Sequence, residues 1–342
     1  MRGEPLAGLG VALPVLAAPL GGGPGNGAMV RAAGEAGSLG FLAGGYKHPD
    51  AMAGEIAELR AAATPFGVNL FAPNPLAVEP AAYARYAALL AETAAGLGVE
   101  LPQQPREDDD WWEEKLALLG EDPVPVVSFT FGLPAPAELA RLRRAGSLLV
   151  QTVTSPREAV AAAEAGVDAL IVQSHEAGGH WGTLTPAEPP ERVALPPLLE
   201  SVAAACSLPL IGAGGFGSAE DLAAALACGA AAGMVGTALM LAPEGGTSAT
   251  HRAALAERSR ETVATRAFTG RPARGLRNGF IDRFEAQAPL GYPALHHLTA
   301  PLRRAAAAAR DPELLHLWAG TGYREARSEP VGDALRRLSA LA

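Results

Sequence analysis

Short apolar segments alternate with longer alanine-rich segments about eight times along the first 242 residues of this chain. The short segments are almost continuously apolar, as parallel strands covered on both faces require. The longer segments repeat their apolar residues at helical spacing. This alternation is typical of a closed (β/α)₈ TIM barrel of roughly 250 residues, and a doubly wound open sheet is the alternative that periodicity leaves open. We expect strands at Leu13–Ala18, Leu39–Ala43, Phe66–Leu70, Val124–Phe129, Leu148–Val153, Ala169–Gln173, Pro209–Ala213 and Gly233–Leu239.

The pattern changes beyond residue 242. The remainder is predicted to be helical, most clearly at Arg303–Ala309. The chain of 342 residues exceeds a barrel of roughly 250 by about 92, which matches this tail. We therefore predict an α/β barrel over residues 1–242 and a helical cap region over residues 243–342, packed on the barrel mouth. Barrel helices are expected at Met29–Ala36, Met52–Ala62, most of residues 77–122, Ala137–Arg144, from Ser155 (paired with Glu158 in a capping box) through Ala165, Leu198–Ala205 and Ala219–Ala227.

Composition and charge exclude several classes of protein. The chain has 27 basic and 36 acidic residues, a net charge of −9, without a basic stripe, so nucleic acid and anionic membranes are not expected partners. Gly, Pro or a charge interrupts every apolar run well before a membrane span of roughly 20 residues, and the N-terminal residues lack the apolar core of a signal peptide. Cys206 and Cys228 form no CxxC pair and are expected to be buried, reduced thiols. A cytoplasmic monomer or homodimer is predicted.

An acidic run precedes two tryptophans in the polar stretch Gln103–Asp110, which interrupts the third predicted helical stretch. Residues 107–110 read Glu-Asp-Asp-Asp, followed by Trp111 and Trp112. Such a run is compatible with a partner site, but negative side chains are also favourable at the positive end of a helix dipole. We interpret it as a solvated helix start.

Two glycine pairs follow the last two predicted strands. Gly214-Gly215 would let the backbone approach a ligand closely, and Ser218 then caps a helix whose free N–H groups can hold an anion. Gly236-Thr237 opens the next helical segment in the same way. Because barrels of this class commonly bind phosphate with the loops after strands seven and eight, the two pairs together predict a phosphate site.

A histidine in a long loop is the strongest candidate for catalysis. His180 follows Gly178-Gly179, after the strand that ends at Gln173, in a loop expected to run over residues 174–190. A neutral imidazole there can take a proton from carbon or orient an anionic substrate. His175 is a competitor without comparable backbone freedom. The other histidines lack neighbours at metal-ligand spacing, so no metal is predicted.

These segments in combination resemble the nitronate monooxygenases, formerly called 2-nitropropane dioxygenases, which are FMN-dependent TIM barrels. The resemblance extends over nearly the whole chain. It rests on Pro14–Gly22, Pro65–Phe71, Val127–Phe129, Gln173 with Glu176–His180 and Gly182, Ala213–Gly215, Gly236-Thr237, Phe268–Arg274 with Asn278, and Leu317–Gly320.

The resemblance implies roles for individual residues. His180 would act as general base toward a nitroalkane or orient its nitronate, FMN would accept an electron, and dioxygen would complete oxidation to a carbonyl compound and nitrite. Flavin contacts are implied for Asn69, Gln173 and Gly178, and the ribityl phosphate would lie at Gly215 and Met234 to Thr237. The full implied set of cofactor-binding residues is Ala18, Pro19, Asn69, Gln173, Gly178, Gly214, Gly215, Met234, Val235, Gly236 and Thr237.

Three positions depart from the family pattern. Leu20 stands where Met is usual, His175 precedes Glu176, and Trp181 follows the histidine where Arg is common. Leu20 is nearly isosteric with Met, whereas Trp181 removes a positive charge from the expected pocket rim. We therefore predict that Leu20 and Trp181 contact the substrate. FMN-dependent enoyl-acyl carrier protein reductases, which use NAD(P)H, carry a very similar Glu-Ala-Gly-Gly-His loop and are the alternative; Arg271–Arg274 and the Trp318 tail favour the nitronate enzymes.

Overall fold

The computed structural model describes residues 9–188 and 191–342, and in these ranges eight parallel strands close into a barrel. Each strand pairs with the next, and β9 returns to pair with β1 through Val15 opposite Gly233. The barrel prediction is confirmed, and the open-sheet alternative is wrong because the first and last strands are hydrogen-bonded. The barrel strands are β1 (Val15–Ala17), β2 (Gly40–Ala43), β3 (Phe66–Ala72), β4 (Val126–Phe131), β5 (Leu148–Val153), β6 (Ala169–Gln173), β8 (Leu210–Ala213) and β9 (Ala232–Val235).

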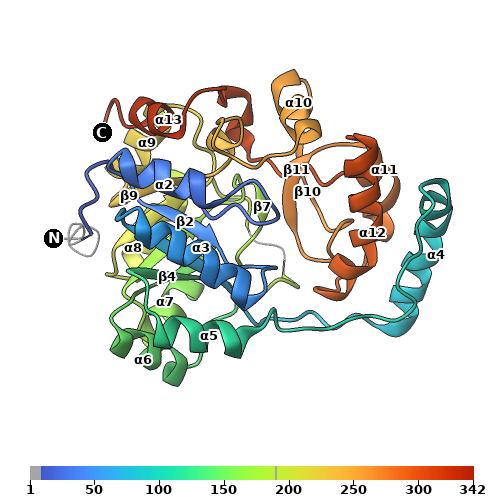
Figure 1. The fold of residues 1–342 in the computed structure, drawn as a ribbon, viewed down its shortest axis with the longest axis horizontal. Coiled ribbons are helices and arrows are strands. Elements are labelled where there is room, and N and C mark those ends of the chain that lie inside the picture. Colours follow the sequence, from blue (N-terminus) through green and yellow to red (C-terminus); the bar gives the residue numbers. More distant parts are fainter. Residues whose placement is uncertain (1–8, 189–190) are drawn as a thin grey trace.

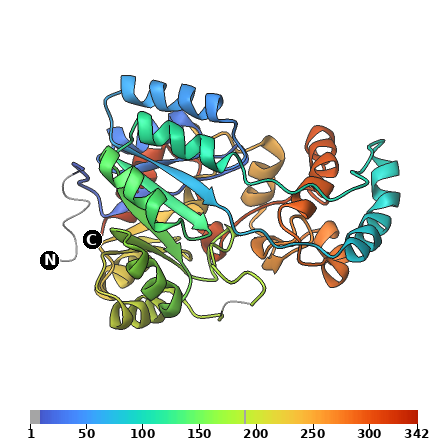
Figure 2. The same ribbon diagram turned by 90° about the horizontal axis from the view of Figure 1, so that it is seen from below.

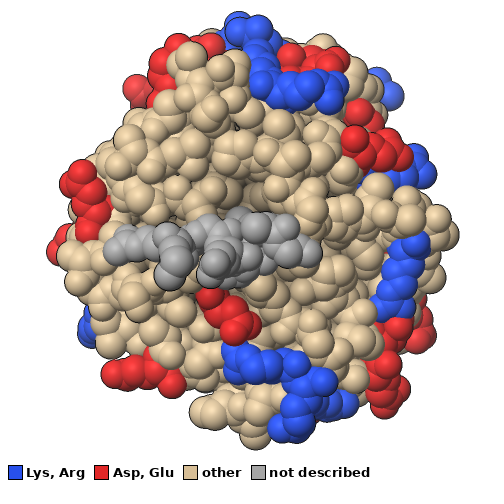
Figure 3. Space-filling view, turned by 90° about the vertical axis from the view of Figure 1, so that its left-hand side faces the viewer, with Lys and Arg blue, Asp and Glu red and all other residues tan. Residues whose placement is uncertain are grey.

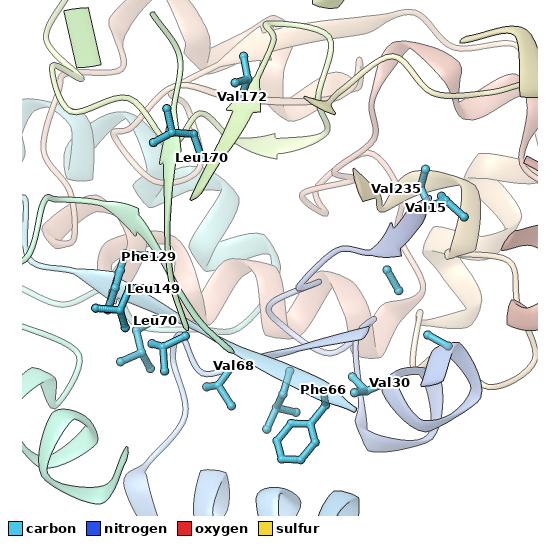
Figure 4. Close-up of a cluster of buried hydrophobic side chains, with 14 of the residues drawn as sticks. Val15, Val30, Phe66, Val68, Leu70, Phe129, Leu149, Leu170, Val172 and Val235 are labelled. Atoms are coloured by element: carbon cyan, nitrogen blue, oxygen red, sulfur yellow. The ribbon is translucent and has the colours of Figure 1, made fainter. Parts of the chain in front are cut away.

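Alternation along each strand divides the apolar side chains between two cores. In β6, Ala169 and Ile171 point into the barrel, where they pack with Leu16, Val126 and the other inward residues. Leu170 and Val172 point outward to the layer between strands and helices (Figure 4). Both faces of the strands are thus buried, which explains why the strand sequences are apolar at successive positions.

The barrel helices begin at sequence-encoded caps. Ser155 accepts a hydrogen bond from the backbone N–H of Glu158, and Ser218 accepts one from Asp221. Proline occupies the first turn of several others, where its missing N–H costs nothing. The helices on the barrel are α2 (Gly27–Glu35), α3 (Pro49–Ala61), α5 (Trp112–Glu121), α6 (Pro136–Ala145), α7 (Pro156–Ala165), α8 (Leu195–Ala205), α9 (Ala219–Ala227) and α13 (Val331–Leu338).

A second region stands beyond the carboxyl ends of the strands and is not purely helical as expected. It contains α10 (Ala249–Glu257), α11 (Gly279–Phe284) and α12 (Ala294–Ala309). It also contains a three-stranded antiparallel sheet in which β11 (Ala273–Leu276) lies between β10 (Thr262–Thr265) and the short β7 (Gly179–His180). The tail therefore contributes strands that pair with the histidine loop, a long-range pairing that local apolar spacing cannot reveal.

Helix α4 (Pro80–Gly96) leaves the barrel and joins this second region. Figures 1 and 2 show α4 beside α11 and α12, at the end of two long connections. Its Leu90 and Tyr86 belong to one apolar cluster with Phe268, Phe280 and Leu298. Conversely, α13 lies near the end of the chain but packs on the barrel, against α2 and α9. The predicted division of the chain at residue 242 stays a prediction.

Two local expectations were wrong. The last strand ends at Val235, and Thr237–Leu239 forms a 3₁₀ turn. The acidic run is not a solvated helix start at Asp110, whose carboxylate is 2.7 Å from the buried Lys115 ammonium and accepts a hydrogen bond from the Tyr46 N–H. Burial raises the pKa of Asp110 to about 6. The carboxylate is drawn inward because the ammonium beside it would otherwise be buried without a partner.

The visible part of the face farthest from α4 carries blue and red side chains next to one another around its edge (Figure 3). No single-sign patch dominates that visible part, in keeping with the charge pattern of the sequence. Among the described residues, no helix combines the length and the apolar character needed to cross a bilayer. The N-terminal residues used for the signal-peptide prediction (1–8), and Pro189 and Pro190 at the end of the predicted loop, lie outside the described ranges.

Candidate active site

A cavity of about 560 Å³ opens where the barrel strands end and the second region covers them. Side chains or backbone from almost every residue predicted to bind the cofactor or substrate border it. They come from five barrel strands, β1, β3, β6, β8 and β9, or the loops that follow them, which the closed topology brings to one rim. The predicted residues that line the cavity are Ala18, Pro19, Leu20, Asn69, Gln173, Gly178, His180, Gly214, Gly215, Met234, Val235, Gly236 and Thr237.

Four backbone N–H groups form a donor cradle on one side of the cavity. The N–H groups of Gly214, Gly215, Gly236 and Thr237 make no hydrogen bond to another backbone group of the described chain. Gly214 and Gly215 have φ angles of +109° and +81°, which glycine adopts without a steric penalty. A row of free donors between two loops is suited to a phosphate or another anion.

The sequence predicted that the helix after Gly214-Gly215 would add free N–H groups to this cradle, but the N–H groups just before that helix are already bonded. The Asp221 carboxylate accepts hydrogen bonds from the N–H groups of Gly217 and Ser218, both at 2.9 Å. The Asp221 carboxylate thus satisfies the two N–H groups that precede α9. Neither Ser218 nor a residue of α9 lines the cavity, and the predicted anion site at the Ser218 cap stays a prediction.

Two side-chain amides also line the cavity, from β3 and β6. The Asn69 Nδ2 group donates to the Ser128 and Thr130 hydroxyls, each at 3.0 Å. The Gln173 Nε2 group donates to the His180 carbonyl oxygen at 3.2 Å, and its Oε1 accepts from the Gly182 N–H at 2.7 Å. Both amides are oriented by the barrel, and Gln173 also anchors both ends of the histidine segment.

His180 is held at the cavity by the small sheet and by Thr269. Its backbone pairs with Ala273 of β11, and its Nε2 atom lies 2.9 Å from the Thr269 hydroxyl. Burial, followed by the positive charges of Arg271 and Arg303, lowers the pKa of His180 to about 3. The imidazole is therefore neutral at physiological pH, as the role of a proton acceptor requires.

Aromatic residues that sequence reasoning missed surround His180. Its ring centroid lies 5.7 Å from Phe131, 5.8 Å from Tyr292 and 5.5 Å from Trp318. Phe131 ends β4 with φ of +83°, a conformation that a bulky residue adopts rarely and that is found at functional sites. The sequence places Phe131 two residues beyond the expected end of the strand, which is the region where site residues are expected. Its left-handed conformation, however, is not encoded in a recognisable local motif.

Trp181 and His175 do not reach the cavity. Trp181 is buried, its backbone N–H donates to the Pro272 carbonyl, and it is not part of the cavity lining. Trp181 directly follows β7 and lies outside this lining, so the geometry of the cavity gives no support to its predicted contact with the substrate. His175 lies 2.9 Å from the Val193 carbonyl oxygen through Nδ1 and is likewise outside the lining.

Positive charge enters the cavity from α12 and not from the position after the histidine. Arg303 and Arg304 line it together with His296 and His316. Sequence reasoning recognised this stretch only as a clear helix, because which face of a helix meets a cavity is decided by tertiary packing. The charge that Trp181 does not supply is thus present on another element.

A buried carboxylate ties the segment after His180 to the barrel. The Glu158 carboxylate accepts hydrogen bonds from the Thr183 hydroxyl and the Leu184 N–H, both at 2.7 Å, and from the Thr154 N–H at 2.5 Å. Arg271 donates to the Thr183 carbonyl oxygen at 2.7 Å and stacks over Phe131. The segment following the histidine is therefore fixed at both its side chains and its backbone.

Comparison with known proteins gives one consistent result. The family model described as nitronate monooxygenase matches residues 4–340. A probable nitronate monooxygenase from Staphylococcus aureus is 31% identical over 316 residues, covering 91% of this chain and 89% of that protein. The solved structure of nitroalkane oxidase from Streptomyces ansochromogenes superposes with a TM-score of 0.93 at 44% identity, covering 98% of this chain and 97% of the other.

A structure of the alternative enzyme class is less similar to this chain. FabK from Thermotoga maritima superposes with a TM-score of 0.77 at 25% identity, covering 99% of this chain and 95% of the other. The match to the nitroalkane oxidase is stronger in both backbone and sequence, and the family model extends over the barrel and the second region alike. This chain belongs to the nitronate monooxygenase family and is an oxidoreductase.

Proposed function

We propose that the protein oxidises alkyl nitronates, and nitroalkanes after loss of a proton, with FMN and dioxygen, giving a carbonyl compound and nitrite. The observation that carries this proposal is the pairing of a free N–H cradle with a neutral, buried histidine in one cavity. The cradle is suited to the phosphate of a flavin mononucleotide, and the histidine to an acidic C–H group next to a nitro group.

The chain's own residues fit FMN in three respects. The cavity of about 560 Å³ is of the size that cofactors occupy. The N–H groups of Gly214, Gly215, Gly236 and Thr237 would hold the phosphate, while the Asn69 and Gln173 amides would contact the ring system. Bound FMN would supply the electron acceptor that no side chain provides.

The hydrogen bonds around His180 favour one ring nitrogen as the base. The Thr269 hydroxyl has a single hydrogen and lies 3.2 Å from the Arg271 carbonyl oxygen, which can only accept. When Thr269 donates there, its lone pairs accept from Nε2–H of His180 at 2.9 Å. The lone pair then resides on Nδ1, which would take the proton from a neutral nitroalkane and keep it on the ring.

The cofactor and the reaction are tested in sequence. Purified protein is expected to show flavin absorbance, either as isolated or after addition of FMN and removal of the excess. It should then consume oxygen with ethylnitronate in the absence of NAD(P)H and release nitrite. Failure to bind FMN would contradict the cofactor assignment. Rapid NADH-dependent reduction of an enoyl thioester, without nitronate oxidation, would instead favour the reductase alternative.

The role of His180 is tested by His180→Ala. We expect FMN to remain bound and turnover of nitroethane to fall by roughly 10²–10⁴-fold, because a general base contributes about that much. Ethylnitronate, which has already lost the proton, should be affected far less. If nitroethane turnover is unchanged, His180 is not the base.

A further inference from the structure

The cavity is free of acidic side chains although the protein is acidic. None of the described residues that line the cavity is Asp or Glu, whereas Arg303 and Arg304 both line it. The chain as a whole, by contrast, has a net charge of −9. The wall formed by α12 therefore presents positive charge that no carboxylate of the lining offsets. Such a wall favours a negatively charged ligand.

Arg303 is buried without a counter-ion. Its side chain is 9% exposed, and no carboxylate among residues 9–188 and 191–342 lies within 4 Å of it. Nε donates to the Thr299 hydroxyl at 3.2 Å and Nη2 to the His296 carbonyl oxygen at 2.8 Å, whereas Nη1 makes no hydrogen bond to the described chain. A buried guanidinium with an unused nitrogen is costly unless a negative group meets it.

The other deeply buried cations are satisfied differently. Lys115 pairs with Asp110 at 2.7 Å, away from the cavity. Arg271 donates to two backbone carbonyl oxygens, of Asn74 and Thr183, and lies over the Phe131 ring without lining the cavity. Arg274, which is 8% exposed, donates to the His175 and Thr262 carbonyl oxygens and does not line the cavity either. Of these four cations, Arg303 alone faces the cavity.

Arg303 lies on a different side of the cavity from the donor cradle. It holds His296, whose ring stacks on Tyr46 at 4.3 Å and lies 6.3 Å from Tyr292, the neighbour of His180. Tyr46 follows β2, whereas the cradle follows β8 and β9, on the other side of β1. The charge of Arg303 is therefore placed toward the histidine wall and not toward the cradle that would hold a cofactor phosphate.

We propose that Arg303 selects negatively charged substrates by donating from its free Nη1 group to an oxygen of the nitronate. The inference rests on the proposed function and assigns a specificity residue to it. A nitronate and its parent nitroalkane have the same carbon skeleton, but only the nitronate has a net negative charge on its planar pair of oxygens. A guanidinium fork matches that charge and shape, and its hydrogen bonds are strengthened when the acceptor is ionised.

The first test compares two substrates that differ by one proton. The kcat/KM values for ethylnitronate and nitroethane are measured with FMN-loaded wild type, Arg303→Gln, Arg303→Lys and Arg304→Gln. We expect Arg303→Gln to lose roughly tenfold or more with ethylnitronate and less than about threefold with nitroethane, since one hydrogen bond to a charged group accounts for such a factor. Where nitroethane is not turned over, its inhibition constant against ethylnitronate replaces kcat/KM.

The variants on α12 serve as matched controls. Arg303→Lys keeps the charge but not the planar fork, so it should recover only part of the loss. Arg304→Gln removes the same charge one residue along, but Arg304 is exposed, so solvent screening should make its effect smaller than that of Arg303→Gln. Equal losses with both substrates, or no loss with either, would overturn the proposal.

A binding measurement separates this inference from the reaction itself. Sodium nitrate, a planar anion, is titrated calorimetrically into FMN-loaded protein at constant ionic strength set with chloride. Wild type should bind nitrate roughly tenfold more tightly than Arg303→Gln. Equal affinities, or no nitrate binding to wild type, would contradict the role of Arg303. If wild type binds nitrate through Arg303 but oxidises no nitronate, the proposed function fails and the anion site stands.

Discussion

Gly178 is the residue at which the histidine loop comes closest to the end of the chain. A Cβ atom at this position would lie 2.5 Å from the Gly320 nitrogen and 2.7 Å from the Ala319 carbonyl carbon, both backbone atoms that cannot rotate away. At the adjacent Gly179, φ is +77° but no heavy atom lies within 4 Å of the added Cβ. The first glycine is thus required for space and the second for conformation.

This difference predicts different outcomes for two neighbouring substitutions. Gly178→Ala should move the loop or residues 319–320, and we expect the Kd for FMN to rise by roughly tenfold, about 1.4 kcal/mol. Gly179→Ala should cost about 1 kcal/mol of backbone strain but change the FMN Kd by much less. Fluorescence titration of FMN into both variants checks this. Equal FMN affinities would show that the close approach of residue 178 is unimportant.

His251 makes stability depend on pH. Its Nε2 donates to the Trp318 carbonyl oxygen at 3.0 Å, and burial lowers its pKa from 6.5 to about 4. Between pH 6.5 and 4 the unfolded chain binds a proton at this histidine, whereas the folded protein does not. The contribution of His251 to the free energy of unfolding is therefore full above pH 6.5 and falls as the pH drops toward 4. Between neutral pH and pH 5 this histidine should cost about 2 kcal/mol. Urea unfolding of His251→Gln should therefore show a shallower acid dependence than wild type, and parallel profiles would refute the assignment.

At the scale of elements, the β7–β11 pairing and helix α7 hold the segment around His180 in place. The strand that carries His180 has only two residues, so its own ladder contributes little, and the Glu158 carboxylate from α7 fixes the residues that follow. A helix on the outside of the barrel thereby controls the position of a loop at its mouth.

Removal of this carboxylate should weaken both stability and catalysis. Glu158→Ala leaves the N–H groups of Thr154 and Leu184 without their acceptor, at a cost of about 2–4 kcal/mol, and kcat should fall because His180 loses its support. Glu164→Ala, on an exposed position of the same helix, should change stability by less than about 0.5 kcal/mol. Urea unfolding and steady-state kinetics of both variants provide the comparison. Similar behaviour of the two would contradict a positioning role for Glu158.

At the scale of the whole molecule, the second region is assembled from separate parts of the chain. Helix α4 packs with residues almost two hundred positions later, and the Tyr86 hydroxyl donates to the Ala267 carbonyl oxygen at 2.6 Å. The cavity therefore exists only when α4, the tail and the barrel rim are all folded. Helix α13 then returns to the barrel beside α2, which places the described C-terminal end near the start of the barrel (Figure 1).

Two adjacent leucines of α4 test this assembly. Leu90 is completely buried against the tail, and Leu90→Ala should destabilise the protein by about 2–5 kcal/mol. Leu89 is 46% exposed, and Leu89→Ala should have an effect below about 0.5 kcal/mol. Thermal unfolding and hydrogen exchange in residues 294–309 report the outcome. Unchanged exchange in α12 after Leu90→Ala would mean that α4 is only loosely attached.

The sequence by itself determined the barrel, because each strand and helix is encoded by local apolar spacing and by caps such as Ser155. It also located the cavity rim at Gly214, Gly236 and His180, since the carboxyl ends of parallel strands must meet at one end of a closed sheet. Only the tertiary structure decided the rest. The strands of the tail, the left-handed Phe131, the inward Asp110, the burial of Trp181 and the orientation of Arg303 all depend on contacts between residues distant in sequence. Such contacts leave no local period, so a single chain read in order does not reveal them.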